Sequence, residues 1–351
     1  MKILGIETSC DETAASIVED GIKEICSVVA SSKEFHEKTG GIVPEIAARK
    51  QVEVIVPVIS ECFEKYKELK KYENIEDCYK DIDAVAVTVG PGLIGSLIVG
   101  VEAAKALALF LDKPLIPVNH LVGHIYGNFL EVEGVKKDIE FPAIVLLVSG
   151  GHTDLVLMEG HGDFEYIGGT LDDAVGEAFD KVARLLGLSR YLGGAILSKK
   201  AQECKINTIE GKLPRPMLDK DTFDFSFSGL KTATRRLVET EKIPVEVVAR
   251  EFEDAVVEVL LNKTIRAVKK YKVKSVLLGG GVSANLYLRQ SIEKECEKLG
   301  VLAHVPPLRL CTDNAVYIAS AAYFMYANEQ EKFKNFDFKD IQPDPSLGFM
   351  D

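Results

Sequence analysis

The amino-acid sequence predicts an α/β protein built from two similar lobes. Two segments, 2–18 and 143–158, each read as an apolar strand, a polar turn and a second apolar strand, the pattern of a β-hairpin. Two others, 83–111 and 274–299, each combine a strand, a glycine-rich turn and a helix. The recurrence indicates a duplication, in which two lobes face each other across a cleft, although such units also recur by chance in α/β chains.

Length and composition agree with a two-lobed globular protein. The 351 residues are enough for two domains at about 100–200 residues each. Hydrophobic residues make up 47% of the chain and charged residues 27%, which excludes collagen, a coiled coil or a mainly disordered chain. The longest apolar run, 93–111, contains Glu102 and Lys105, so we expect no membrane span. Seven widely spaced cysteines without a C-x-x-C pair favour a reducing cytosol over a disulfide framework.

Three glycine-rich turns follow predicted strands: Gly90-Pro91-Gly92, Ser149-Gly150-Gly151 and Gly279-Gly280-Gly281. Such turns can offer backbone N–H groups to phosphate oxygens, because glycine allows close approach and a following helix adds its positive end. None of the three matches the P-loop or dinucleotide-binding pattern. Together they favour a nucleotide site of another kind.

Helical spacing of apolar residues predicts four more helices. They cover residues 44–66, 173–186, 244–268 and a segment from Asp313 to about residue 327. Asp172 or Asp173 is the expected N-cap of the second helix, and Asp313 can cap the last one. Residues 205–231 include two prolines and read as loop and short elements.

His120 and His124 form the sharpest local motif. Two histidines four residues apart lie on one face of a helix and can bind one metal ion, although a packed polar pair is the alternative. Asp313 is a candidate third ligand unless it only caps its helix. Two imidazoles and a carboxylate suit Fe(II) or Zn. Leu121 stands where the H-E-x-x-H motif has its glutamate, which argues against a zinc peptidase.

Two polar residues on helices have both a structural and a ligand-binding interpretation. Asp180 can accept hydrogen bonds from ribose hydroxyls or bind a metal, or it can pair with Arg184 one turn later. Asn285, at the start of the helix after the third glycine turn, can cap that helix or hydrogen-bond a nucleotide. The local sequence leaves these alternatives open.

Charge is unevenly distributed along the chain. The formal net charge is −12, which alone argues against non-specific binding to nucleic acid. Residues 181–236, however, contain 12 Lys and Arg against five Asp and Glu, so this segment carries +7 and the rest carries −19. A basic face can bind an RNA backbone, or it can simply be a solvated surface.

Nine motifs run in order through nearly the whole chain: Gly5–Thr13, Gly41–Arg49, Gly90–Gly95, His120–His124, Leu147–Thr153, Asp172–Lys181, Asp224–Thr232, Gly279–Asn285 and Cys311–Asn314. With them the chain resembles the bacterial TsaD (Gcp) family, the tRNA adenosine threonylcarbamoyltransferases. The resemblance implies an actin-like, Hsp70-like (ASKHA) ATPase fold of duplicated RNase H-like lobes around a nucleotide cleft. It implies an N-terminal lobe of residues 1–135, with 314–351 packing back on it. The C-terminal lobe is then 136–313, including the insertion at about 205–231.

The implied reaction moves a threonylcarbamoyl group from threonylcarbamoyl-AMP to N6 of the adenosine beside the anticodon in ANN-reading tRNAs, with release of AMP. The implied cofactor is one Fe(II) ion, or Zn or another divalent metal, held by His120, His124 and Asp313. Asp11 or Glu12 is the expected acceptor of the amine proton, unless these residues only brace their turn. Substrate or ATP, ADP or AMP would contact Leu147, Val148, Ser149, Gly150, Gly151, Asp180, Gly194 and Asn285.

The implied partners are tRNA, a TsaB-like paralogue and a TsaE-like ATPase, while a TsaC-type synthase supplies the adenylate. The helix 44–66 is expected to pair with the paralogue through Val52, Val56 or Ile59, and a homodimer can form in isolation. The implied location is the cytoplasm, without a membrane. A small-molecule kinase of the same fold and a non-catalytic nucleotide-binding scaffold are the alternatives.

Two positions depart from the family pattern. Val122 replaces the usual glutamate between the histidines, which leaves both imidazoles in place but removes any acid/base role of that side chain. The family's Tyr-Pro-Gly-Gly-Pro appears here as Tyr191–Ala195, with both glycines retained. We expect this loop to keep its backbone role with less stiffness.

Overall fold

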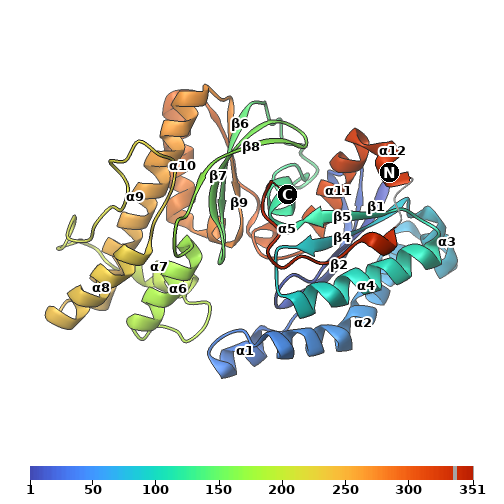
Figure 1. Ribbon diagram of the computed structural model, residues 1–351, viewed down its shortest axis with the longest axis horizontal. Coiled ribbons are helices and arrows are strands. Elements are labelled where there is room, and N and C mark those ends of the chain that lie inside the picture. The colour runs from blue at the N-terminus through green and yellow to red at the C-terminus, as the bar shows by residue number, and fades with distance from the viewer. Residues whose placement is uncertain (335–337, 351) are drawn as a thin grey trace. The chain divides into compact units, whose positions relative to one another are not determined.

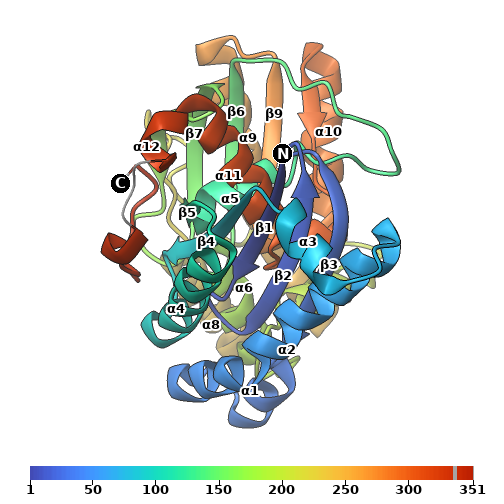
Figure 2. The ribbon, with the colours of Figure 1, turned by 90° about the vertical axis from the view of Figure 1, so that its right-hand side faces the viewer.

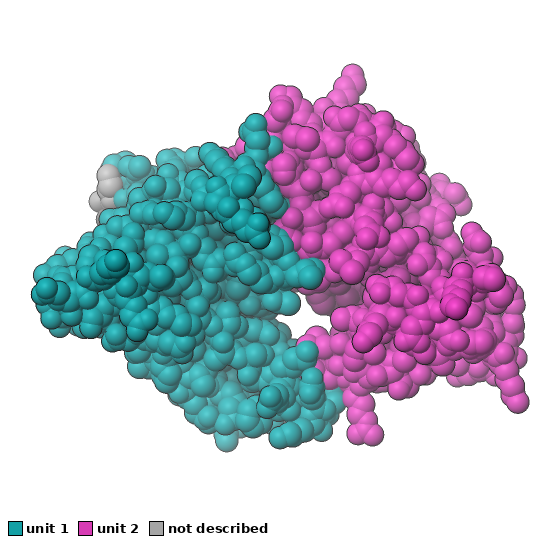
Figure 3. Space-filling model, turned by 180° about the vertical axis from the view of Figure 1, so that it is seen from behind, with its two compact units in different colours: residues 1–138, 307–351 teal, residues 139–306 magenta. Residues whose placement is uncertain are grey.

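Each of two five-stranded sheets is an antiparallel hairpin with a third strand on one side and two parallel strands on the other. The structure is a computed structural model that describes residues 1–334 and 338–350 (Figure 1). By their internal contacts, residues 1–138 with 307–351 form unit 1, and residues 139–306 form unit 2 (Figure 3). The strand order is β3-β2-β1-β4-β5 in unit 1 and β10-β9-β6-β7-β8 in unit 2.

The strands of unit 1 are β1 (Lys2–Glu7), β2 (Glu12–Glu19), β3 (Lys23–Ser31), β4 (Ala84–Gly90) and β5 (Leu115–Asn119). Its helices are α1 (Lys33–Thr39), α2 (Pro44–Lys70), α3 (Ile75–Asp81), α4 (Ile94–Leu111), α5 (His120–Tyr126), α11 (Val316–Asn328) and α12 (Gln330–Lys334). Two 3-10 turns, η2 (Leu308–Leu310) and η3 (Phe338–Asp340), complete it.

The strands of unit 2 are β6 (Ala143–Val148), β7 (Thr153–Gly160), β8 (Asp163–Gly169), β9 (Ser275–Gly279) and β10 (Leu302–His304). Its helices are α6 (Val175–Leu185), α7 (Gly194–Gln202), α8 (Ser228–Thr240), α9 (Val245–Tyr271), η1 (Gly281–Ala284) and α10 (Leu286–Leu299). In both units the hairpin is antiparallel and the first hairpin strand pairs in parallel with the strand that precedes the glycine turn. This shared topology is what the predicted duplication requires.

Successive residues of β1 point to opposite faces of the unit 1 sheet, and helices pack on both faces. Leu4 and Ile6 pack into apolar clusters formed with α2 and α4, which lie side by side on one face (Figures 1 and 2). Gly5 points to the opposite face, where a Cβ atom would lie 2.5 Å from the carbonyl oxygen of Ala315 at the start of α11. Glycine at this position therefore lets α11 pack directly on the sheet.

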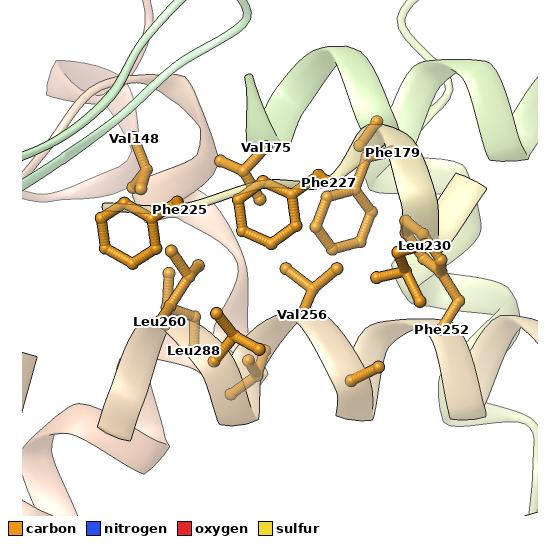
Figure 4. Packing of buried hydrophobic residues seen from close by; sticks show 14 of the residues in the cluster. Val148, Val175, Phe179, Phe225, Phe227, Leu230, Phe252, Val256, Leu260 and Leu288 are labelled. Atoms are coloured by element: carbon orange, nitrogen blue, oxygen red, sulfur yellow. The ribbon is translucent and has the colours of Figure 1, made fainter. Parts of the chain in front are cut away.

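The core of unit 2 lies between one face of its sheet and the helices. Val148 of β6 and Leu288 of α10 belong to one apolar cluster with aromatic side chains from α6, α9 and the segment before α8 (Figure 4). The rings of Phe179 and Phe252 meet edge to face with their centroids 5.3 Å apart, a favourable arrangement for an aromatic pair. This cluster fixes α6 against α9.

The predicted insertion is irregular as far as Phe227, and α8 then begins at Ser228, inside the segment expected to be loop. The buried carboxylate of Glu251 on α9 anchors the irregular part. It accepts hydrogen bonds from Arg215 Nη1 at 2.6 Å and Asn207 Nδ2 at 2.8 Å. Because an unpaired buried carboxylate is costly, these contacts hold the segment onto α9.

The capping predictions at α6 and α11 were wrong. The N-cap of α6 is Ala174, and Asp172 instead accepts hydrogen bonds from Phe227 N at 2.8 Å and Ser226 Oγ at 2.6 Å. At α11 the amide oxygen of Asn314, not Asp313, accepts from the first helical N–H groups. Asp172 and Asp313 each interact instead with residues distant in the sequence, and these contacts compete with the local capping bond.

Among the described residues, helix α4 has the length and composition of a membrane span, with a mean hydropathy of 1.9 over 18 residues. Here it packs against β4 and α2. Its outer side carries the exposed side chains of Ile94 and Ile98.

Candidate active site

Helix α5 presents its two histidines from the carboxyl end of β5. Asn119, the last residue of β5, accepts a hydrogen bond from Leu121 N at 2.9 Å and so caps the helix. His120 and His124 are one turn apart, with ring centroids 4.6 Å from each other. The predicted shared face is therefore present.

Close packing of α11 on α5 places Asp313 opposite these rings. A Cβ atom at Gly123 would lie 2.8 Å from the ring of Tyr317 and 2.7 Å from the side chain of Ile318, so only glycine allows this approach. The Oδ1 atom of Asp313 lies 3.6 Å from His120 Nε2 and 3.5 Å from His124 Nε2. Because Asn314 provides the cap, the Asp313 carboxylate is available to the imidazoles.

The three side chains suit a divalent cation by chemistry and by spacing. One ligand atom from each of His120, His124 and Asp313 lies within 4.8 Å of the others. Two imidazole nitrogens and a carboxylate oxygen are the donors found in Fe(II) and Zn sites. His124 is buried and the other two side chains are partly buried, and His124 Nδ1 makes no hydrogen bond within the described residues. The residues therefore fit such an ion.

The surroundings of the two histidines shift their pKa values in opposite directions. Burial opposes protonation of His120, but the carboxylates of Glu7 and Asp313 outweigh it and raise its pKa to about 9. Burial and the neighbouring His120 lower the pKa of His124. Although burial opposes ionisation of Asp313, the two histidines lower its pKa. The carboxylates of Glu7 and Asp313 thus favour a positive charge at His120, as they would favour a bound cation.

The turn between β1 and β2 brings Asp11 and Glu12 into the same electrostatic environment. Gln51 of α2 holds this turn by donating to the carbonyl oxygens of Thr8, Cys10 and Glu12 at 3.0–3.2 Å. Burial, a hydrogen bond from the protonated Glu12 carboxyl to Asp11 and the charge of Asp313 all raise the pKa of Glu12. The structure thus places Glu12 close enough to Asp313 for their charges to interact.

In unit 2 two of the glycine turns converge. A Cβ atom at Gly280, whose φ is +85°, would lie 2.4 Å from the carbonyl oxygen of Val148, just before the Ser149–Gly151 turn. At the start of α6, a Cβ atom at Gly176 would lie 2.6 Å from the carbonyl oxygen of Ser149. Positions Gly150, Gly151 and Gly281 have no neighbouring atom within 4 Å of an added Cβ atom. These turns therefore leave room for a ligand at the backbone.

The third glycine turn is occupied by the chain itself. A Cβ atom at Gly90 would lie 1.9 Å from the carbonyl oxygen of Asp344, and Gly92 N donates to the carbonyl oxygen of Pro345 at 3.3 Å. The expectation that this turn offers its N–H groups to phosphate was therefore wrong. Its glycines allow the carboxyl-terminal segment to pack closely.

Asp180, Gly194 and Asn285 lie along one connected set of contacts. Asp180 Oδ1 accepts a hydrogen bond from Gly194 N at 2.9 Å, and no ion pair with Arg184 occurs among the described residues. Gly194 begins α7, which also carries Ser198. Asn285 Nδ2 donates to Ser198 Oγ at 2.9 Å and to Glu253 Oε1 at 2.8 Å, while Asn285 Oδ1 caps α10.

The remaining predicted positions, Leu147 and Val148, are fully buried in β6. Sequence reasoning gave no role to Glu7, Tyr317, Ser198 or Glu253, all of which contact predicted site residues. Glu7 carried one signal, because it is a charged residue that interrupts the apolar run of a central strand.

Comparison with known proteins assigns the family. A family profile described as "TsaD: tRNA N6-adenosine threonylcarbamoyltransferase" matches residues 23–320. The chain belongs to the TsaD family. Curated relatives named tRNA N6-adenosine threonylcarbamoyltransferase include one from Syntrophomonas wolfei, 48% identical over 93% of this chain and 93% of its own length. Another, from Bacillus subtilis, is 50% identical over 92% of this chain and 89% of its own length.

Solved structures show the fold of this TsaD family member at low sequence identity. HypF from T. kodakarensis aligns with a TM-score of 0.62 at 15% identity, over 95% of this chain and 48% of that one. Component A of the (R)-2-hydroxyglutaryl-CoA dehydratase of Acidaminococcus fermentans aligns with a TM-score of 0.52 at 15% identity, over 93% and 99% of the two chains. With the two equivalent sheets, these alignments confirm the predicted ASKHA-type α/β fold. The curated relatives favour an acyltransferase over a kinase or a scaffold.

Proposed function

We propose that this chain transfers the threonylcarbamoyl group of threonylcarbamoyl-AMP to N6 of the adenosine beside the anticodon in ANN-reading tRNAs, releasing AMP. The observation that carries the proposal is the 48–50% identity to named transferases over more than nine-tenths of the chain. The matched range 23–320 contains His120, His124, Asp180 and Asp313.

The donor is a mixed carboxylic–phosphoric anhydride and is already activated, so the protein mainly positions it and stabilises charge. The open turns at Gly150, Gly151 and Gly281 would bind the AMP phosphate through backbone N–H groups. Asp180 would accept from a ribose hydroxyl. Asn285 would hydrogen-bond the nucleoside by exchanging one of its present partners, Ser198 or Glu253.

His120, His124 and Asp313 would hold one divalent ion, Fe(II) or Zn. When bound, such an ion supplies a Lewis acid for the reacting carbonyl. The imidazoles and the carboxylate orient toward one point because α5 and α11 fix their backbones. Val122, which lies between the histidines, offers no proton to this chemistry.

The adenosine N6 amine must lose a proton as it attacks. Asp11 or Glu12 would accept it. Burial and Asp11 raise the pKa of Glu12 to about 10, so at neutral pH Glu12 holds a proton of its own and Asp11 is the expected acceptor of the two. The target adenosine must leave its stack to react, as bases do in other nucleic-acid-modifying enzymes.

Partners would use other surfaces. Val52 and Val56 of α2 and Ile94 and Ile98 of α4 are exposed apolar side chains on two helices that pack together, and a TsaB-like paralogue would bind this face. Ile59 is partly buried against the core, so it is a poorer contact than the sequence suggested. A TsaE-like ATPase and a TsaC-type synthase would complete the set, and the reaction would take place in the cytoplasm.

The test is direct. The protein is incubated with these partners, unmodified tRNA, threonine, bicarbonate and ATP, and the digested tRNA is examined by mass spectrometry for N6-threonylcarbamoyladenosine. The double variant His120→Ala, His124→Ala should lose the product, whereas His161→Ala, in the β7–β8 turn of unit 2, should retain it. Absence of product with the folded wild-type protein would contradict the proposed reaction, and product from the double variant would contradict the metal site.

A further inference from the structure

Glu7 is a buried carboxylate at the end of the central strand β1. Its side chain is fully inaccessible to solvent. One carboxylate oxygen, Oε1, accepts from the backbone N–H of Ser9, and the other, Oε2, accepts from Thr88 Oγ1 at 2.5 Å. A buried charge of this kind is retained only where hydrogen bonds compensate its desolvation, and here the turn after β1 and strand β4 supply them.

The third partner of Glu7 is His120. The Nδ1 atom of His120 lies 3.1 Å from Glu7 Oε2, while Nε2 of the same ring faces Asp313 Oδ1 at 3.6 Å. A carboxylate at Nδ1 requires the proton there, which leaves the Nε2 lone pair for a cation. It also fixes the rotation of the ring, since β1 and β4 hold the carboxylate.

The two histidines differ in this respect. His124 Nε2 also faces Asp313 Oδ1, at 3.5 Å, but its Nδ1 makes no hydrogen bond within the described residues. Tyr317 Oη approaches Asp313 rather than a histidine, at 3.4 Å from Oδ1. Of the two histidines, His120 is therefore the one whose Nδ1 atom is paired with a carboxylate.

We propose that Glu7 is a positioning residue for the cation site: through His120 it fixes the ring and tautomer that present Nε2 to a divalent ion. The inference rests on the metal-dependent function proposed above. Glu7 is not itself a ligand, because Ser9, Thr88 and His120 already use its two oxygens. Loss of such an outer carboxylate typically weakens metal affinity by about 10–100-fold.

The test measures metal binding by the full chain, not activity. Metal-free wild type and Glu7→Gln are titrated with Zn²⁺ against a chromophoric chelator, and the visible d–d bands of the Co²⁺-loaded proteins are compared. We expect Glu7→Gln to bind Zn²⁺ about 10–100-fold more weakly and to shift or weaken the Co²⁺ bands. The neutral amide can present its NH₂ group to Nδ1 and so favour the tautomer with the proton on Nε2.

The matched control is Glu251→Gln, because Glu251 is an equally buried, hydrogen-bonded carboxylate in unit 2. It should lose stability toward urea but keep the wild-type Zn²⁺ affinity and Co²⁺ spectrum. If Glu7→Gln does not fold, Glu7→Asp retains the charge while withdrawing it by one methylene, and the same loss of affinity is expected.

The outcomes separate this inference from the proposed function. If the wild type binds Zn²⁺ and the Glu7 variant shows the same Zn²⁺ affinity and the same Co²⁺ spectrum, Glu7 has only a structural role. That result would overturn the inference but not the proposed function. Failure of the folded wild type to bind either metal would overturn the metal-dependent function as well. Weakened binding with an altered spectrum, absent in Glu251→Gln, supports the inference.

Discussion

Asn119 and Gly348 are joined by a hydrogen bond of 2.8 Å from the Asn119 Nδ2 amide to the Gly348 carbonyl oxygen. The Oδ1 atom of the same side chain caps α5 through Leu121 N. One amide thus connects the helix that carries both histidines to the carboxyl-terminal segment. The segment is also attached at the β4 end, where Asp344 N donates to the Val89 carbonyl oxygen at 2.8 Å.

Asn119→Ala should lower the free energy of unfolding by about 1–3 kcal/mol, because a helix cap and a second hydrogen bond are lost together. Urea denaturation measures this, and hydrogen exchange of residues 341–350 should become faster. Asn74→Ala is the control, since Asn74 occupies the N-cap position of α3 without a side-chain capping bond. Equal losses in the two variants would contradict the role given to Asn119.

Gly90→Ala should destabilise the protein by about 1–3 kcal/mol or displace the carboxyl-terminal segment, because the new methyl group would overlap the Asp344 carbonyl oxygen. Limited proteolysis after residue 340 and urea denaturation distinguish these results. Gly41→Ala, where an added Cβ atom meets nothing within 4 Å, should change neither measurement. In a chain ending at residue 342, Gly90→Ala should cause little loss of stability, because the clashing carbonyl group is absent. If the loss of stability persists in the shortened chain, the new methyl group does not clash with the carboxyl-terminal segment.

The sequence predicted those parts of the fold whose signal is local. Strand β6 is a continuous apolar run, and the spacing of His120 and His124 places them one helical turn apart whatever surrounds them. Strand β8 was missed because its burial does not alternate regularly, and α8 was missed because it begins in a stretch with few apolar residues. In these two elements tertiary packing decides the conformation.

Contacts between distant residues could not be predicted in this way. Glu7 and His120 are 113 residues apart, and they meet because β1, β4 and β5 are neighbours in one sheet. The capping prediction for Asp313 failed because Asn314 is equally able to cap, and only the packing of α11 on α5 decides between them. The occupation of the Gly90 turn depends on a segment more than 250 residues later.

The double variant Val52→Glu, Val56→Glu should abolish pairing with the TsaB-like paralogue while leaving the fold intact. Both side chains are largely exposed, at 63% and 66%, so a charge there costs the isolated protein little. Size-exclusion chromatography of the mixed proteins measures pairing, and circular dichroism checks the fold. Leu109→Glu, an exposed apolar residue at the far end of α4, is the control and should still pair. Unimpaired pairing of the double variant would move the interface away from this face.

The double variant Arg235→Glu, Arg236→Glu should weaken tRNA binding about tenfold or more and reduce its dependence on salt. Both arginines are exposed on α8, and neither makes an ion pair among the residues that the structure describes, so they are available to phosphates. Filter binding at several salt concentrations gives affinity and slope. Lys294→Glu, Lys298→Glu on α10 changes the net charge equally and should have a smaller effect. Equal effects of the two pairs would indicate general electrostatics rather than a site on α8.

Asp154→Asn should stabilise the protein at pH 7. Asp154 on β7 is only 7% exposed, and burial raises its pKa to about 6, although Tyr166 Oη donates to it at 3.1 Å. Because the folded chain holds this proton more tightly than the unfolded chain, wild-type stability contains a penalty that grows as pH rises from about 4 to about 6. The rise of the Asp154 pKa to about 6 corresponds to a penalty of at most about 3 kcal/mol at pH 7.

The variant keeps an oxygen acceptor for Tyr166 but has no charge to bury, so this part of the pH dependence should vanish. Urea denaturation of wild type and variant at pH 4, 5, 6 and 7 gives the difference in their free energies of unfolding. The contributions of the other titrating groups cancel in this difference, because both proteins contain them. The gain should be near zero at pH 4 and complete by pH 7. Asp163→Asn, at the exposed start of β8, should leave the wild-type profile unchanged. If Asp154→Asn is no more stable than wild type at pH 7, other interactions in the folded protein offset the cost of burying the ionised carboxylate. Burial then does not raise the pKa of Asp154.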